Sequence, residues 1–131
     1  MADLVEPLDR ALRSTRVLVR QTAVSAYYGR PVPKSYSLLA FDLADAADMV
    51  ADELAADRMA VSARDALLAV GEASGLVERA DELTAEVVLG QLRSVVVDLL
   101  LLTGLSQIES TEALPPPPRW QPEPGAAPGD E

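Results

Sequence analysis

Three aspartates in the first half of the chain have a spacing that could hold a cation. Asp45, Asp48 and Asp52 are three and four residues apart, so on a helix they share one face. Carboxylate oxygens are the ligands that hard divalent cations prefer. The chain has no histidine and no cysteine, which removes imidazole and thiolate ligands and the commonest general base. We therefore expect a solvated helix face and predict no metal, no cofactor and no catalytic residue.

A single acid, Asp98, lies within the most apolar stretch of the sequence, residues 84–103. A carboxylate buried in a cleft can have a shifted pKa and a role in proton transfer. The interpretation that we favour is structural. Asp98 either shares a polar helix stripe with Gln91 and Ser94, or pairs with an arginine such as Arg93 or one from the first helix.

Tyrosines cluster around the first predicted loop, at Tyr27, Tyr28 and Tyr36. Tyrosine offers a large contact area with a polar tip, so the three rings could form the rim of a small-molecule pocket or of an interface. They could equally close the end of a helical bundle. A dry cavity on the order of a few hundred Å³ beside Tyr27 or Tyr36 would favour ligand binding.

Charge is distributed unevenly between the first two predicted helices. Residues 1–34 hold six basic and three acidic groups, a net charge of +3, and residues 35–60 hold one basic and six acidic groups, a net charge of −5. Arg13, Arg16 and Arg20 belong to the basic stripe. We expect the two helices to be antiparallel neighbours whose stripes could pair along their edges. The stripes are either two solvated faces of ordinary helices, or they set helix registry or dock a second subunit. The overall charge of −10 argues against nucleic-acid binding.

The stretch at residues 84–103 predicts a helix that is apolar almost all round, and such a helix is central in a bundle or embedded in lipid. Glu86, Arg93 and Asp98 argue against lipid, because charged residues near the middle of a membrane span are costly. Gly104 suits the left-handed position that ends a helix. We expect a core helix, no membrane span and a cytoplasmic location.

The remaining periodicity predicts an all-α protein, an antiparallel four-helix bundle with a short extra C-terminal turn and a disordered Pro-rich tail. Ser62 is the predicted N-cap of the third helix, and Gly71 and Gly75 within that helix predict either close approach of a neighbouring helix or a kink. Ser106 and Glu109 have capping-box spacing. The bundle domain is predicted at residues 1–114 and the acidic tail at 115–131. The helices are predicted at about residues 4–28, 35–58, 62–80 and 84–103.

Two stretches, LADAADMVADELAADR and GQLRSVVVDLLLLTGLSQIESTEAL with the prolines that follow, resemble the C-terminal soluble helical region of bacterial FUSC-type proteins, the fusaric acid resistance and aromatic acid exporter family. The shared phrase, Q-[LV]-R-S-x-[AV]-V-D-L-L-x-x-[ST]-G-[LM], is met at Gln91 to Leu105, and the resemblance covers residues 38–118. Family members carry several transmembrane helices before this region, and this sequence has none. The resemblance implies no catalytic residues, and it implies packing and registry roles for Arg93, Ser94 and Asp98.

Three functions remain open from the sequence. The first is a non-catalytic interaction or oligomerisation domain resembling the soluble part of FUSC-type exporters, with a membrane-protein partner or a second copy in a homodimer. The second is an independent regulatory or ligand-binding bundle that uses the tyrosines near the first loop. The third and least favoured is a carboxylate-metal enzyme, which would need the aspartates at positions 45, 48 and 52 to converge with acids of another helix.

Overall fold

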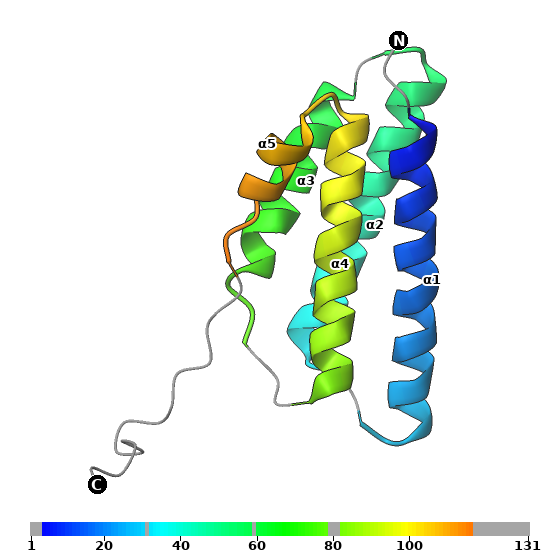
Figure 1. Cartoon of the computed structure of the whole chain (residues 1–131), viewed down its shortest axis with the longest axis vertical. Helices are drawn as coiled ribbons and strands as arrows, with labels where there is room; N and C mark the ends of the chain where they lie inside the picture. Colours follow the sequence, from blue (N-terminus) through cyan, green and yellow to red (C-terminus); the bar gives the residue numbers. More distant parts are fainter. Residues whose placement is uncertain (1–3, 31, 59, 79–81, 117–131) are drawn as a thin grey trace, which may run out of the picture.

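The computed structural model describes residues 4–30, 32–58, 60–78 and 82–116, and within them it contains helices and no strands (Figure 1). The all-α prediction is therefore confirmed for this part of the chain. No helix among these residues is long and apolar enough to cross a membrane. The five helices are α1 (Val5–Tyr27), α2 (Lys34–Ala55), α3 (Val61–Ser74), α4 (Leu83–Leu102) and α5 (Gln107–Glu112).

The centre of the fold is α4, which contacts each of the other four helices. Ten of its residues are buried, and the side chains of Val96 and Leu100 are 1% and 0% exposed. Figure 1 shows α1 along one side of α4, and α3 with α5 along the opposite side. The central position predicted from an almost complete apolar circumference is confirmed, because neighbours cover this helix on several sides.

The C-terminal end of α4 and the start of α5 have the geometry that the sequence predicts. Gly104 has a φ of 99°, in the left-handed region that glycine adopts without strain. The Ser106 hydroxyl accepts a hydrogen bond from the Glu109 backbone N–H at 3.1 Å, and the Glu109 carboxylate accepts one from the Ser106 N–H at 3.1 Å. These reciprocal bonds form a capping box.

The boundaries of α3 differ from the prediction at both ends. The residue before the helix is Ala60, with no side-chain capping bond, so Ser62 lies within the helix. The helix ends at Ser74 rather than at residue 80, because a later segment packs closely against this end. A Cβ atom on Gly71 would lie 3.0 Å from Leu114 Cδ1, and one on Gly75 would overlap the Pro115 ring.

Pro115 therefore belongs to the packed body, although the sequence places it at the start of the tail. It is half-buried, and its carbonyl oxygen accepts a hydrogen bond from Arg93. The rest of the predicted Pro-rich tail, from residue 117 onward, lies outside the described residues.

The expectation that α1 and α2 lie side by side is wrong. No Cα atom of α1 lies within 8 Å of a Cα atom of α2, and α1 contacts α4 alone among the helices. The physical reason is the apolar circumference of α4. α1 buries apolar residues against one side of α4, while α2 and α3 pack together against the rest of α4. Sequence adjacency and a short loop did not decide the packing.

Candidate functional site

The separation of α1 from α2 leaves an apolar groove with α4 as its floor. Its volume is about 450 Å³. Val88 and Leu92 of α4 form the floor, and both are buried. The walls come from α1, the following loop and α2: Leu18, Val19, Thr22, Ala23, Ala26, Val32, Tyr36, Ser37 and Ala40. Among the described residues that line this groove, the Tyr36 phenol is the one ionisable group.

The α1 wall continues beyond the groove as an exposed apolar edge. Leu8, Leu12 and Val19 recur at spacings of four and seven residues, which places them on one side of the helix. Their exposed fractions are 47%, 50% and 63%. The face of α1 that packs on α4 is a different one and buries Pro7, Ala11 and Ser25. One helix thus carries two apolar edges, of which only one is covered by the fold.

Ala40 of the α2 wall belongs to an edge of small side chains that continues along α2 beyond the groove. Ala40, Ala44, Ala47 and Ala51 follow one another at spacings of four, three and four residues, so they share one edge of α2. Ala40 and Ala47 are half-buried, and Ala44 and Ala51 are exposed. A wall of methyl groups lets another backbone approach closely. We call the surface formed by this alanine edge, the leucine and valine edge of α1 and the groove between them the α1–α2 face.

The three tyrosines have separate positions. Tyr36 is 1% exposed, lines the groove with its ring and donates its hydroxyl to the Glu78 carbonyl oxygen at 3.1 Å. Tyr27 and Tyr28 are 83% and 67% exposed at the end of α1, and their rings contact each other edge to face at 5.1 Å between centroids. Of the predicted pocket rim, Tyr36 lines the groove.

The charged stripes do not meet within the molecule. Arg13 pairs with Asp9 of its own helix at 2.9 Å. Among the described residues no ion pair joins an arginine of α1 to an aspartate of α2. Arg16 and Arg20 are exposed on α1, and so are the three predicted aspartates on α2, Asp45, Asp48 and Asp52. In the described part of the chain no group of three or more acidic side chains could hold a metal ion.

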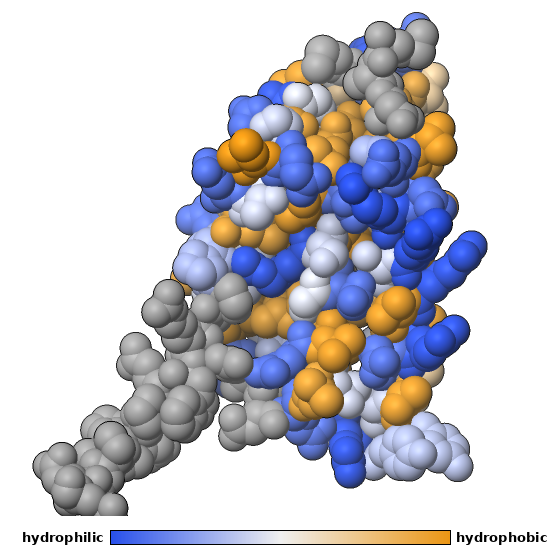
Figure 2. Space-filling view, viewed as in Figure 1, coloured by the Kyte–Doolittle hydropathy of each residue, from blue (hydrophilic) through white to orange (hydrophobic). Residues whose placement is uncertain are grey.

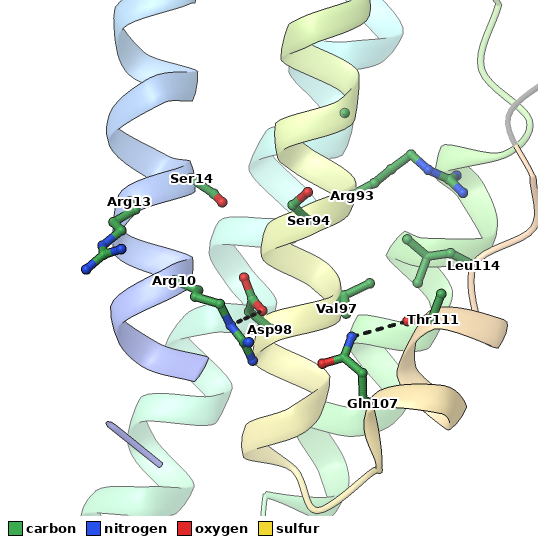
Figure 3. Close-up of a pocket in the computed structure, with 11 residues that line it drawn as sticks. Arg10, Arg13, Ser14, Arg93, Ser94, Val97, Asp98, Gln107, Thr111 and Leu114 are labelled. Atoms are coloured by element: carbon green, nitrogen blue, oxygen red, sulfur yellow. Dashed lines mark hydrogen bonds and ion pairs between the residues drawn. The ribbon is translucent and has the colours of Figure 1, made fainter. Parts of the chain in front are cut away.

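Asp98 pairs with an arginine of α1 rather than with its helix neighbour. Its Oδ1 lies 3.4 Å from Arg10 Nε, and the residue is 8% exposed (Figure 3). Burial raises the pKa of the Asp98 carboxyl, and the nearby Arg10 guanidinium lowers it in part. This pair lines a cavity of about 660 Å³ between α1, α4 and α5. Arg13 borders the same cavity, but its guanidinium points away from it in Figure 3.

Arg93 connects α4 to two other segments through hydrogen bonds. Its guanidinium donates to Ser74 Oγ at 2.8 Å, at the end of α3, and to the Pro115 carbonyl oxygen after α5. Burial lowers the pKa of this guanidinium. Ser94, one residue on, is exposed at the edge of the larger cavity. Both charged members of the phrase that resembles FUSC-type proteins therefore make contacts between segments of the fold.

A further arginine with a structural contact was not predicted from the sequence. Arg64 of α3 donates from Nε to Thr103 Oγ1 at 3.2 Å, and from its second nitrogen to the Thr103 carbonyl oxygen. It thereby satisfies a carbonyl group at the C-terminal end of α4. The two residues are 39 positions apart, so no local spacing rule connects them.

Comparisons of this chain with protein-family models, with curated proteins and with solved structures gave no match. The resemblance to FUSC-type proteins therefore remains a prediction that rests on the phrase from Gln91 to Leu105.

Proposed function

We propose that this protein is a non-catalytic helical interaction module and that its docking surface is the α1–α2 face. The observation that carries the proposal is the second apolar edge of α1. Leu8, Leu12 and Val19 are about half exposed or more, although the chain has an apolar core large enough to bury such residues. Exposed apolar side chains that recur along one edge of a helix are a feature of interaction sites.

The shape and chemistry of the face suit a helical partner. On the α1 side of the groove, large side chains recur at about one or two helical turns. On the α2 side lies an edge of alanines, and such a combination is typical of helix-in-groove recognition. Among the described residues that line the groove there is no carboxylate or amine, and the Tyr36 phenol donates to a backbone carbonyl oxygen. The remaining polar side chains of the lining are the hydroxyl groups of Thr22 and Ser37. These properties favour binding over acid–base catalysis.

Within this proposal, the protein is a cytoplasmic relative of the soluble helical part of FUSC-type exporters. Its α1 to α4 form an antiparallel four-helix bundle, followed by α5 and a solvated Pro-rich tail. The support is the phrase from Gln91 to Leu105. We expect a membrane-spanning FUSC-type protein to be encoded beside it and to co-purify with the tagged chain. If the gene has no such neighbour and no such protein co-purifies, the family assignment is removed. The docking surface is then judged separately.

Cross-linking in the cells that produce the protein tests the docking surface. We expect a photo-reactive phenylalanine analogue at Leu12 or Val19 to form a covalent adduct with another chain. The control is the same analogue at Leu76, a residue that is 80% exposed after α3 and away from the face. Adduct yields that are equal at the three positions would contradict the proposal.

A small apolar ligand is the second candidate, and the cavity beside Tyr36 favours it. A volume of about 450 Å³ falls in the range of small-molecule sites. Ala40→Trp would fill the groove with an indole ring. We expect it to abolish binding of anilinonaphthalene sulfonate to the native protein, whereas Ala69→Trp on the exposed side of α3 should not. Dye fluorescence unchanged by Ala40→Trp would exclude this site.

A further inference from the structure

Two helices of opposite charge lie in one chain without touching each other. The range of α1 holds four arginines and two carboxylates, a net charge of +2, and that of α2 holds one lysine and five carboxylates, a net charge of −4. The helix α1 packs on α4, and no Cα atom of α1 lies within 8 Å of a Cα atom of α2. The complementarity between the two helices is unused within the described fold.

We infer that the partner on the α1–α2 face is a second copy of this chain, with α1 of each copy lying against α2 of the other. The inference rests on the docking surface proposed above and names its occupant. A two-fold axis would generate both contacts at once, because a symmetric dimer uses the same surface on both subunits. A foreign partner would have to supply an acidic surface for α1 and a basic one for α2.

The charges are placed where such a contact needs them. On α1, Arg16 is four residues after Leu12 and three before Val19, so it borders the exposed apolar edge. On α2, Asp48 is four residues after Ala44 and three before Ala51 and borders the alanine edge in the same way.

Farther around each helix lie Arg20, next to Asp9 when viewed down the helix axis, on α1 and Asp52 and Asp45 on α2, all of them exposed. When α1 of one copy covers the groove of the other, the leucine and valine edge meets alanines and the arginine rim meets the aspartate rim. The apolar contact supplies the association energy, and the charged rims select the pairing and its register.

The mass of the purified full-length chain provides the first test. Light scattering at micromolar concentration is expected to give twice the 13.9 kDa of one chain. Two double variants then reverse the rims, Arg16→Glu with Arg20→Glu, and Asp45→Arg with Asp48→Arg. Each places like charges at both contacts of a homodimer, and we expect each to weaken self-association by at least about tenfold.

Mixing the two variants distinguishes a loss of charge complementarity at the interface from a loss of folding in the variants. In the mixed pair the reversed α1 of one variant faces the reversed α2 of the other, and the two unaltered helices also face each other. Every rim contact is again between opposite charges, so the mixture is expected to form a heterodimer near wild-type strength. A single chain that carries all four substitutions is expected to form a homodimer for the same reason.

A matched control carries the same charge change as the α2 variant away from the face. Asp65→Arg with Glu72→Arg alters two exposed residues of α3 and is expected to leave the dimer intact. A wild-type monomer at high micromolar concentration would overturn the inference, and so would a dimer that neither reversal weakens. The cross-linking experiment tests the docking surface separately. A cross-link from Leu12 to a chain of another mass would support the docking surface and exclude the homodimer.

Discussion

Arg93 joins three segments that are separate in the sequence, through Ser74 and the Pro115 carbonyl oxygen. We expect Arg93→Met to lower the free energy of unfolding by about 2 kcal/mol, because the substitution leaves buried acceptors without their charged donor. Urea denaturation measures the change. Arg58→Met, at an exposed position after α2, is the control and should change stability little. A loss for Arg93→Met no larger than that of the control would contradict the role.

The buried carboxyl of Asp98 gives stability a pH dependence of known sign. Burial raises its pKa in the folded chain, and Arg10 offsets only part of this rise. Such a carboxyl contributes stability below its unfolded pKa of about 3.9, and this contribution is lost as the pH rises through the folded pKa. We therefore expect Asp98→Asn to gain stability relative to wild type as the pH is raised from that value toward neutrality.

Urea midpoints of both proteins across this pH range provide the measurement. Asp65→Asn, at an exposed position of α3, is the control and should show no such trend. A difference between Asp98→Asn and wild type that is constant with pH would exclude an effect of the shifted pKa.

At the residue scale, the sequence could predict charges but only some of their partners. An arginine of the first helix was one of the expected partners of Asp98, and the structure identifies Arg10. The contacts from Arg64 to Thr103 and from Arg93 to Ser74 span 39 and 19 positions. Such pairs follow from tertiary packing, which no helical spacing rule encodes.

Among the elements, α4 contributes most to the core. Leu100 is 0% exposed, and we expect Leu100→Ala to cost about 2–4 kcal/mol through lost burial and the cavity left behind. Thermal or urea unfolding measures it. Leu83→Ala removes the same atoms at the first turn of α4, where Leu83 is 77% exposed, and should cost far less. Equal costs would show that α4 is not central.

Alanine substitutions at two glycines test whether a neighbouring segment packs closely against each position. A Cβ on Gly75 would overlap the Pro115 ring, so we expect Gly75→Ala to destabilise the protein by about 1–3 kcal/mol. A Cβ on Gly90, within α4, would meet nothing within 4 Å, and Gly90→Ala should stabilise by up to about 1 kcal/mol. Chemical denaturation of both variants checks the pair, and changes of the same sign would contradict the packing of Pro115.

At the element scale, periodicity predicted the helices well because it reports local geometry. The end of α3 was predicted too late, since the spacing of Gly71 and Gly75 indicated a close neighbour but neither which segment it is nor that the helix ends at this point. The neighbour of α1 was also wrong. Its partner was decided by the apolar circumference of α4, more than 50 residues away in the sequence.

For the whole molecule, the packed body is expected to end soon after Pro115. We predict that truncation after Pro116 leaves the unfolding temperature within about 1 °C of wild type, because residues rich in proline and polar groups contribute little burial. Truncation after Ala113 removes Leu114, which is 8% exposed, and the Pro115 acceptor of Arg93, and should lower it clearly. Differential scanning calorimetry compares the two, and similar losses would place later residues in the core.

The all-helical fold and its central helix could be predicted because α4 shows its burial in its own composition. The groove could not be predicted, because it lies between α1 and α2, which do not pack closely against each other. Its existence depends on how three helices share one apolar surface. The candidate site is therefore a property of the assembled molecule, although every edge that forms it is periodic in the sequence.

The single attachment of α1 has a consequence for how the fold opens. Every helix contact of α1 runs to α4, whereas α2, α3 and α4 contact one another. Detaching α1 would break one interface and the Arg10–Asp98 pair and leave the three-way packing of the others in place. The chain thus has the layout of two cooperative units of unequal stability. Amide protons of α1 would then exchange with solvent through partial openings that do not require the core to unfold.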